Sequence, residues 1–237
     1  MQPYEGLAPY YDLLYEQSRQ IDFGAEDAQL VAEIRRLAPD ARTLLEVGCG
    51  TGIRLANLRA QFSVEGVDLS PAMLRVARRR LPGVRLHQGD FTAFKLRRRF
   101  DVVACLFSGI AYARTVARLR RAIRNLADHL APGGVLVLDG WVEPGRWKAG
   151  TLSVDDASDG EVAIVRLSRS SRRGRLAVME WDFLLARRGR VEHFTERHEV
   201  GLFERRQFVE ALEAAGLEVV VDPEGCFGRG RYFGVKP

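Results

Sequence analysis

Cysteine, lysine and long apolar runs are scarce in this 237-residue sequence, and each scarcity excludes a class of protein. The three cysteines, Cys49, Cys105 and Cys226, are odd in number, widely spaced and match no zinc motif. We therefore expect reduced thiols in the cytoplasm rather than a disulfide framework. No run of about 18 apolar residues occurs, so no membrane span is predicted. The N-terminal residues lack a basic start and an apolar run, so no secretory signal is predicted.

Lysine is so rare that only three lysines stand among the 36 basic residues, and the formal net charge is +5. Two arginine runs, Arg78-Arg79-Arg80 and Arg97-Arg98-Arg99, fall at a predicted helix end and in a loop. Nucleic-acid binding needs basic residues interleaved with stacking aromatics, which these runs lack. Solvated faces are therefore the favoured interpretation, and no nucleic-acid partner is predicted. No clustered triad of His, Asp and Glu suggests a metal, so none is predicted.

The most informative segment is Leu44-Leu45-Glu46-Val47-Gly48-Cys49-Gly50-Thr51-Gly52. Two apolar residues precede Glu46, which predicts a buried strand that ends in an acid. Three glycines in five positions allow a tight turn and a close approach of a ligand to the main chain, at the start of a helix. A dinucleotide site would need G-x-G-x-x-G. The pattern E-x-G-x-G-x-G resembles that of class I S-adenosylmethionine methyltransferases, although a plain strand–helix turn also fits it.

A second apolar strand ends at Asp68, about 20 residues after Glu46, the separation expected of an acid that binds a ribose. Ser70 and Pro71 predict the cap and first turn of a helix. Met73 lies on the apolar face of that helix. The less favoured alternative for Asp68 is a solvated loop acid.

A third strand ends at Asp90-Phe91, where the carboxylate can accept a hydrogen bond from the adenine amino group and the ring can pack against adenine. Phe107 and Asp139 follow the next two strands. Because ligands of parallel sheets gather at the carboxyl ends of strands, these side chains are expected to surround one site. The predicted S-adenosylmethionine-binding residues are Glu46, Gly48, Gly50, Gly52, Asp68, Leu69, Met73, Asp90, Phe91 and Phe107.

Strands alternate with helices as far as residue 139, which is the pattern of a parallel sheet. We predict an α/β fold, a Rossmann-like seven-stranded class I methyltransferase sheet with helices on both faces. The helix after the fourth strand is expected to stop at Ala131-Pro132-Gly133-Gly134. The predicted strands are 43–47, 63–67, 84–88, 100–106, 135–139, 217–221 and 231–235; the predicted helices are a segment ending near 38, one from 52, 71–81, one containing 119–130, and 204–215.

Between about residues 141 and 203 the apolar residues alternate, which is typical of an inserted antiparallel β-meander. The insertion is too long for an ordinary loop, so we expect it to cover the substrate, pair two subunits, or both. The predicted organisation is a S-adenosylmethionine-binding core with an N-terminal helical cap (1–140), the inserted sheet (141–203) and the completion of the core sheet (204–237).

Beyond the superfamily, the chain resembles the dTDP-aminosugar N,N-dimethyltransferases, which complete dimethylamino sugars for antibiotics. The resemblance implies a dTDP-linked deoxy amino sugar as substrate, S-adenosylmethionine as methyl donor, a cytoplasmic location and a homodimer. It leaves open whether the amine is at C3 or C4 of the sugar. The matching segments are Tyr11-Asp12-x-x-Tyr15, Arg78-Arg79-Arg80-Leu81-Pro82-Gly83-Val84, Leu86-His87-Gln88-Gly89-Asp90, His129-Leu130-Ala131-Pro132-Gly133-Gly134, Leu202-Phe203-Glu204-Arg205 and Gly228-Arg229-Gly230.

The resemblance also implies which residues meet the substrate. It places Tyr15 and Arg229 at the phosphates, although Arg229 could also be a surface arginine at a hairpin tip. Tyr112 stands where relatives often carry a histidine, and it could handle the proton or only orient the amine, because the reference pKa of tyrosine is near 10. Trp141 could wall the sugar pocket or belong to the core, and two histidines match family positions on the inserted sheet. The predicted catalytic residues are Tyr112 and His193, and the predicted substrate-binding residues are Tyr15, Trp141, His198 and Arg229.

Other functions remain compatible with such a site. One is methylation of a different small amine or hydroxyl metabolite, and another is a non-catalytic S-adenosylmethionine-binding module. RNA methylation ranks last, because no RNA-binding domain is apparent in the sequence.

Overall fold

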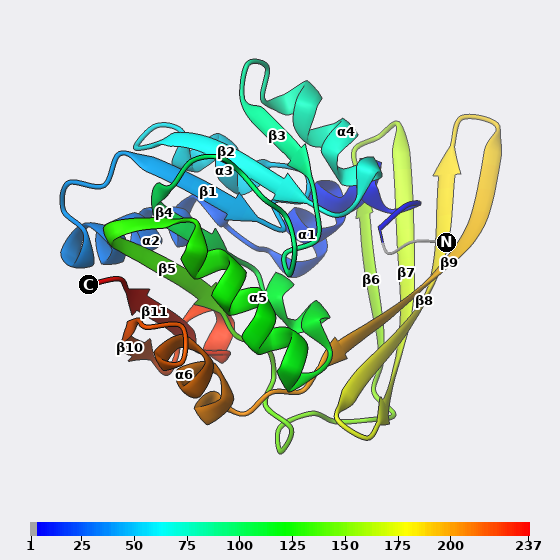
Figure 1. Ribbon diagram of the computed structural model, residues 1–237. Coiled ribbons are helices and arrows are strands. Elements are labelled where there is room, and N and C mark those ends of the chain that lie inside the picture. The colour runs from blue at the N-terminus through cyan, green and yellow to red at the C-terminus, as the bar shows by residue number, and fades with distance from the viewer. Residues whose placement is uncertain (1–3) are drawn as a thin grey trace.

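The computed structural model describes residues 4–237, apart from the side chain of Cys226. Two features of the sequence analysis therefore lie outside the described part. One is residues 1–3, the start of the N-terminal segment for which no secretory signal is predicted, and the other is the thiol of Cys226. Cys49 and Cys105 are buried and free, as expected for reduced thiols. Within the described residues the chain forms a seven-stranded sheet beside a four-stranded sheet (Figure 1).

The larger sheet has the strand order β10-β11-β5-β4-β1-β2-β3, and its first five strands in the chain are parallel. The last strand, β11, is antiparallel to both of its neighbours. This is the class I methyltransferase sheet that the sequence predicts, and the strand order reverses between β1 and β4, where ligands of open sheets bind. The strands are β1 (Thr43–Val47), β2 (Ser63–Asp68), β3 (Arg85–Gln88), β4 (Phe100–Cys105), β5 (Leu130–Asp139), β10 (Glu218–Asp222) and β11 (Arg231–Val235).

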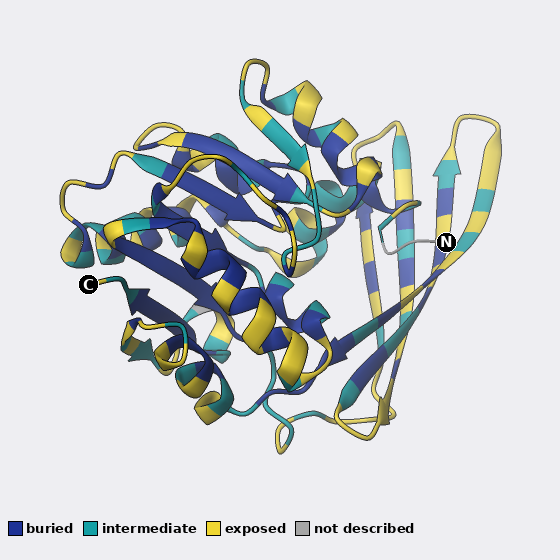
Figure 2. Cartoon of the chain, viewed as in Figure 1, coloured by how far each residue is buried: buried dark blue, intermediate teal, exposed yellow. Residues whose placement is uncertain are grey.

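Helices cover both faces of this sheet, as predicted (Figure 1). Alternate residues of a strand point to opposite faces, so Val102 and Val103 of β4 enter two separate apolar cores. Figure 2 shows the central strands of this sheet as mostly buried. One core holds Leu119 and its neighbours on α5, and the other holds Leu30 and its neighbours on α2. The helices on the first face are α5 (Val116–Asp128) and α6 (Arg205–Glu213), and those on the second are α2 (Phe23–Leu37), α3 (Ile53–Leu58) and α4 (Pro71–Arg80).

The predicted end of α5 is wrong. The helix ends at Asp128 and β5 already begins at Leu130, five residues before the predicted strand start. The segment Ala131-Pro132-Gly133-Gly134 is an irregularity inside β5, because Phe100 pairs with Leu130 and Val102 pairs with Val135. Lys236 holds this segment through backbone hydrogen bonds with Gly133 and Gly134. The proline and glycines therefore interrupt a strand rather than terminate a helix.

The insertion forms the predicted antiparallel meander. Its inner face packs on the N-terminal segment η1 (Ala8–Tyr10) and α1 (Tyr11–Arg19), where Leu7 and Leu14 meet Trp181 and Phe183 in one cluster. Asp155 ties these parts together, because it accepts hydrogen bonds from both Arg19 and Arg166. The N-terminal cap is thus docked on the inserted sheet. The strands are β6 (Leu152–Ser158), β7 (Val162–Arg173), β8 (Leu176–Arg187) and β9 (Arg190–Gly201).

The outer face of the four-stranded sheet, defined here by Val154, Leu167, Leu184 and Val191, exposes large apolar side chains. Val154 pairs with Leu167 across β6 and β7, so apolar side chains adjoin one another there. Exposed fractions of these four side chains run from 48% to 70%, which is unusual for neighbouring residues of one sheet face.

Candidate active site

A cavity of about 560 Å³ lies at the carboxyl ends of β1, β2 and β4, beneath the N-terminal cap. It is bounded on the far side by η2 (Gly109–Ala113) and by β9. The structure thus gathers the strand-end residues into one place, as the sequence predicts. Of the predicted cofactor residues, those that line the cavity are Glu46, Gly48, Gly50, Asp68, Leu69, Met73, Asp90, Phe91 and Phe107.

The glycine turn presents its backbone to the cavity. Gly50 has φ +54°, and a Cβ built on it meets no protein atom within 4 Å, so this position opens onto free space. Gly52 does not line the cavity, contrary to the prediction. It has φ +74°, and a Cβ there would lie 2.7 Å from Leu81 Cδ1 and 3.2 Å from Ala77 Cβ. Gly52 is therefore required by the close packing of the turn against α4 and not by a ligand.

Asp68 is held rigidly at the edge of the cavity. Its carboxylate accepts a hydrogen bond from Gly50 N at 2.8 Å and another from Ser70 N at 2.7 Å. Burial raises the pKa of this carboxyl, and the backbone donors oppose that shift. Ser70 caps α4 through Met73 N, as predicted, which fixes Met73 beside Asp68. Each Asp68 oxygen keeps a lone pair, which suits the two hydroxyls of a ribose.

Glu46 and Arg54 bring a carboxyl group and a guanidinium to the same end of the cavity. Glu46 Oε2 is buried without a hydrogen-bond partner among the described residues, and burial raises the pKa of Glu46 to about 8. Arg54 lies on α3, where its Nη2 is 2.6 Å from Asp27 and its Nη1 is 3.6 Å from Asp139. The amino-acid end of S-adenosylmethionine carries an ammonium and a carboxylate, which Glu46 and Arg54 can pair. Sequence reasoning missed Arg54, although it follows the glycine turn directly.

Asp90 sits at the opposite end, with Phe91 beside it in the lining. Partial burial acts to raise the pKa of Asp90, but hydrogen bonds from Thr92 and Arg118 outweigh it and lower the pKa. Arg118 Nη2 lies 3.1 Å from Asp90 Oδ2, and sequence reasoning missed this partner because it lies on α5. An ionised acceptor next to an aromatic ring fits adenine. Glu46, Asp68 and Asp90 together therefore fit S-adenosylmethionine from one end to the other.

Phe107 forms the hub of an aromatic cluster at the end of β4. Its backbone has φ +51°, a left-handed conformation that a non-glycine residue adopts only under constraint, and its N–H donates to buried Asp139. Its ring centroid lies 5.6 Å from those of both Tyr15 and Phe23, and 5.9 Å from that of Phe227. Phe107 therefore separates the cofactor end of the cavity from the residues predicted to meet the nucleotide.

Three predicted substrate residues, Tyr15, Trp141 and Arg229, lie around this cluster and do not line the cavity itself. Tyr15 accepts a hydrogen bond from Arg166 Nη1 at 3.3 Å. The guanidinium carbon of Arg229 lies 4.4 Å from the centroid of Trp141, and its Nη1 lies 3.5 Å from Ser108 Oγ. Tyr15 contacts Phe107 directly, whereas Arg229 and Trp141 are linked to it through Phe227.

The two histidines of the inserted sheet lie on opposite faces of β9. His193 points from β9 to the exposed outer face, where its Nε2 lies 3.0 Å from Asp182, so the structure does not bring it to the cavity. His198 is completely buried and does not line the cavity either. It contacts Tyr112, which does line the cavity, at 2.6 Å. A predicted direct contact of either histidine with the substrate therefore finds no support in this geometry.

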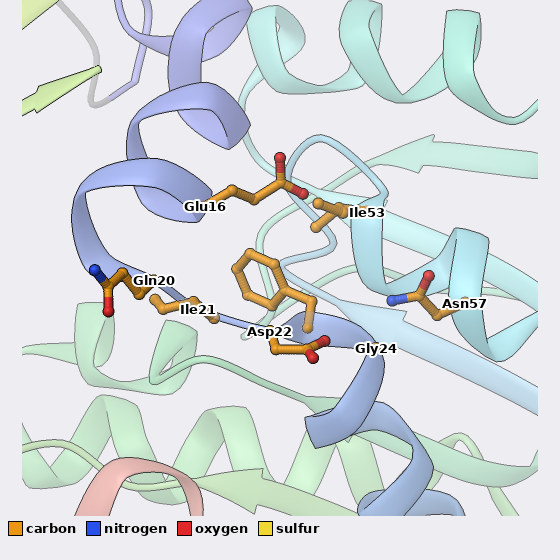
Figure 3. A pocket seen from close by; sticks show the side chains of 8 residues that line it. Glu16, Gln20, Ile21, Asp22, Gly24, Ile53 and Asn57 are labelled. Carbon is orange, nitrogen blue, oxygen red and sulfur yellow. The ribbon is translucent and has the colours of Figure 1, made fainter. Parts of the chain in front are cut away.

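A shallower hollow of about 490 Å³ adjoins the cavity and shares Phe23 and Ile53 with it. Figure 3 shows Gln20 and Ile21, from the link between α1 and α2, on one side of this hollow, and Ile53 and Asn57 of α3 on the other. The hollow therefore lies next to the end of the cavity that is lined by Arg54.

Among residues 4–237, the side chain of Cys226 excepted, no group of three or more His, Cys, Asp and Glu side chains is placed to hold a metal ion. Over the same residues, no helix has both the length and the apolar character needed to cross a membrane.

Comparison with known proteins agrees with the geometry. Residues 44–134 match a family described as a methyltransferase domain. Over 231 residues the chain is 40% identical to the dTDP-3-amino-3,6-dideoxy-alpha-D-glucopyranose N,N-dimethyltransferase of Streptomyces fradiae, covering 97% of this chain and 90% of the relative.

Solved structures show the same likeness. The crystal structure of Streptomyces venezuelae DesVI has a TM-score of 0.92 and 38% identity, covering 97% of this chain and 98% of DesVI. The S-adenosylmethionine-bound structure of CalS10, an amino pentose methyltransferase from Micromonospora echinaspora, has a TM-score of 0.86 and 39% identity, covering 96% of both chains. Because the likeness extends over almost the whole chain, the protein belongs to the S-adenosylmethionine-dependent methyltransferase family that includes the dTDP-aminosugar N,N-dimethyltransferases.

Proposed function

We propose that this methyltransferase adds two methyl groups in succession to the amino group of a dTDP-linked deoxy amino sugar. The observation that carries the proposal is the 40% identity to a dTDP-aminosugar N,N-dimethyltransferase over 97% of the chain. A methyltransferase core alone would say little about the acceptor, because many acceptors are served by one fold. The matched length also contains the inserted sheet, which contributes Arg197 and Glu199 to the cavity lining.

S-adenosylmethionine supplies a methyl group on a positively charged sulfur, and transfer to an amine forms a C–N bond while the electron pair of the broken C–S bond stays on sulfur. The protein's contribution is alignment and exclusion of water. In this proposal Glu46 and Arg54 hold the amino-acid end, Asp68 holds the ribose, and Asp90 holds the adenine. The two backbone hydrogen bonds that Asp68 already accepts support this role, because a fixed carboxylate loses little freedom on binding.

The nucleotide side of the substrate is proposed to lie at the group formed by Tyr15, Trp141 and Arg229. An arginine held over an aromatic ring suits a diphosphate, because the ring fixes the plane of the guanidinium fork. Phe107 lines the cavity and contacts Tyr15, which supports a position for the sugar between the cofactor end and the nucleotide.

The test is to incubate the enzyme and S-adenosylmethionine with dTDP-linked 3-amino and 4-amino sugars and to analyse the products by mass spectrometry. Monomethyl and then dimethyl products are expected with at least one series. Absence of methylated product in both series would reject the substrate class. Calorimetry with S-adenosylhomocysteine, run beside it, separates that result from failure of the cofactor site.

Asp68→Asn is the matched variant for the cofactor site. The amide would turn a donor toward Gly50 N or Ser70 N, and a lost charge-assisted hydrogen bond is worth about 1.5–3 kcal/mol. We expect S-adenosylhomocysteine affinity to fall about 10- to 100-fold in calorimetry. Unchanged affinity would remove Asp68 from the proposed site.

We also propose a cytoplasmic homodimer, joined through the outer face of the four-stranded sheet. The exposed apolar side chains of that face support the dimer, and the free thiols of Cys49 and Cys105 support a reducing compartment. We further propose that residues 1–140 and 204–237 form the core and that residues 141–203 form an inserted unit.

A further inference from the structure

Four side chains form a continuous hydrogen-bonded chain that runs from the cavity into the inserted sheet. Tyr4 Oη lies 2.7 Å from Tyr112 Oη, and Tyr112 Oη lies 2.6 Å from His198 Nδ1. His198 Nε2 lies 2.9 Å from Glu196 Oε2. Tyr4 and Tyr112 line the cavity, whereas Glu196 and His198 are buried behind them. The chain joins three parts of the molecule that are distant in sequence: the N-terminal segment, η2 and β9.

The direction of this chain follows from Glu196. Its Oε2 accepts from Tyr4 N at 2.9 Å, and its Oε1 accepts from Gly6 N and Leu7 N at 3.1 Å each. With His198 as the fourth donor, both carboxylate oxygens are fully used as acceptors. The proton of neutral His198 must therefore be on Nε2, which leaves Nδ1 as an acceptor.

An acceptor at His198 Nδ1 requires that Tyr112 donates its hydroxyl proton to it. Tyr112 Oη then accepts from Tyr4 at 2.7 Å and keeps one lone pair that can face the cavity. Every donor thus points away from the cavity toward Glu196. In this arrangement the Tyr112 hydroxyl can accept a proton from the cavity and pass its own proton to His198.

The geometry points to a proton relay in which Tyr112 accepts a proton from the substrate's amine and hands its own proton to His198 Nδ1, while Glu196 fixes the imidazole tautomer and stabilises the imidazolium. The inference rests on the proposed amine methylation. The amine nitrogen keeps the electron pair of its broken N–H bond, and the proton resides on His198 until it returns through Tyr112 to water. Glu196 acts through His198 and is a positioning residue. The logic matches that of a carboxylate–histidine pair in acyl transfer.

A phenolate at Tyr112 cannot replace this relay. Burial, together with the nearby tyrosines, raises the pKa of Tyr112 well above its ordinary value, so the hydroxyl stays protonated near neutral pH. The groups that face His198 are Tyr112, Tyr4, Glu196 and the ring of Trp181, whose centroid lies 3.9 Å away. Arg166 lies behind Trp181 and is paired with Asp155, while Tyr11 and Tyr15 complete the surroundings of the two phenols.

The relay has a consequence for double methylation. After the first transfer the nitrogen is a secondary ammonium, which must lose a proton before it can attack again. An enzyme without the relay depends on water to remove that proton, so the intermediate would leave before the second transfer. Damage to the relay should therefore raise the ratio of monomethyl to dimethyl product.

The test compares Tyr112→Phe, His198→Gln and Glu196→Gln with the control His87→Gln. His87 forms the same kind of pair with Glu65, at 3.0 Å, but on β3 outside the cavity. At pH 7 each relay variant should lose about 100-fold in kcat, within the range for general acid–base catalysis. That deficit should shrink as the pH approaches the pKa of a free amine, about 10 by analogy with lysine. Monomethyl product should accumulate, and S-adenosylhomocysteine affinity should stay within about twofold of the wild type.

A deficit independent of pH, or no deficit, would overturn the relay. Tyr112→Phe removes one oxygen only, so it keeps the test readable should a buried substitution at His198 or Glu196 fail to fold. ¹⁵N NMR of the histidines gives a readout without substrate: the wild type should show His198 protonated on Nε2, and Glu196→Gln should move the proton to Nδ1. Protonation on Nδ1 in the wild type contradicts the relay, whereas lack of turnover with every amino sugar contradicts only the proposed function.

Discussion

The three strand-end acids that line the cavity differ in their electrostatics because their neighbours differ. Glu46 is buried with an unpartnered oxygen, Asp68 is partly buried and receives two backbone hydrogen bonds, and Asp90 is half-exposed beside Arg118. Burial therefore raises the pKa of Glu46 to about 8, whereas hydrogen bonds lower the pKa of Asp90 despite its partial burial. One sequence signal, an acid after a strand, thus yields a proton-binding group at one end and a fixed anion at the other.

The raised pKa of Glu46 predicts a pH-dependent stability difference between the wild type and Glu46→Gln. Between about pH 4.3, the ordinary value for Glu, and about pH 8 the folded state keeps the Glu46 proton and the unfolded state does not. The stabilisation is present at low pH and is lost as the pH rises through this window. The free energy of unfolding of the wild type, measured with urea, should fall relative to Glu46→Gln by at most about 1.4 kcal/mol per pH unit. A difference that stays constant from pH 5 to pH 8 would show that Glu46 is ionised throughout.

Spacing in the sequence could predict Glu46, Asp68 and Asp90, because each follows its own strand and parallel strands end at one edge. It could not say which of His193 and His198 faces inward, because that depends on how β9 is placed in the four-stranded sheet. His193 and His198 lie five positions apart, so they point to opposite faces of the strand. Arg118 was missed because it reaches the site from a helix face that sequence periodicity marks only as solvent-exposed.

At the scale of elements, the turn between β1 and α3 combines a packing glycine and a ligand-facing glycine. Gly52→Ala would bring a Cβ within 2.7 Å of Leu81 and force a positive φ on alanine, at a cost of about 2–4 kcal/mol in unfolding free energy. Gly50→Ala meets no protein atom, so it should cost only about 1–2 kcal/mol but lower S-adenosylhomocysteine affinity at least tenfold. Urea unfolding and calorimetry on both variants check this. Equal losses of stability would refute the assignment.

The apolar outer face of the four-stranded sheet is tested by a charged substitution at its centre. Leu184 lies on the outer face between Val165 and His193, and its side chain is 48% exposed. Leu184→Arg should leave the fold intact, because surface substitutions usually change stability by about 0.5 kcal/mol or less. It should convert the proposed dimer to a monomer in light scattering coupled to size-exclusion chromatography. Arg169→Glu, on the same face, is the control variant, because it changes the charge of that face without removing apolar area. A wild-type monomer, or a Leu184→Arg dimer, would contradict the proposed interface.

Across the whole molecule, the parallel sheet and the meander were predictable because their apolar periods differ. The boundary of α5 and β5 was not, since proline and glycine end a helix in most contexts, whereas here Pro132 lies inside a strand and Gly133 and Gly134 pair with Lys236. The hydrogen-bonded chain could not be predicted either, because Tyr112 and His198 are 86 residues apart in the sequence. Tyr112 lies in η2, next to the seven-stranded sheet, and His198 lies on β9 of the four-stranded sheet. Long-range contacts of this kind arise only when the insertion folds back over the N-terminal cap.

The most direct test of the account is a crystal structure with S-adenosylhomocysteine and a dTDP-linked amino sugar. We predict the ribose hydroxyls on Asp68, the adenine at Asp90 and Phe91, and the sugar amine within hydrogen-bond distance of Tyr112 and in line with the sulfur. A complex with the sulfur turned away from Tyr112, or with the amine bound to solvent-facing groups such as His193, would contradict it.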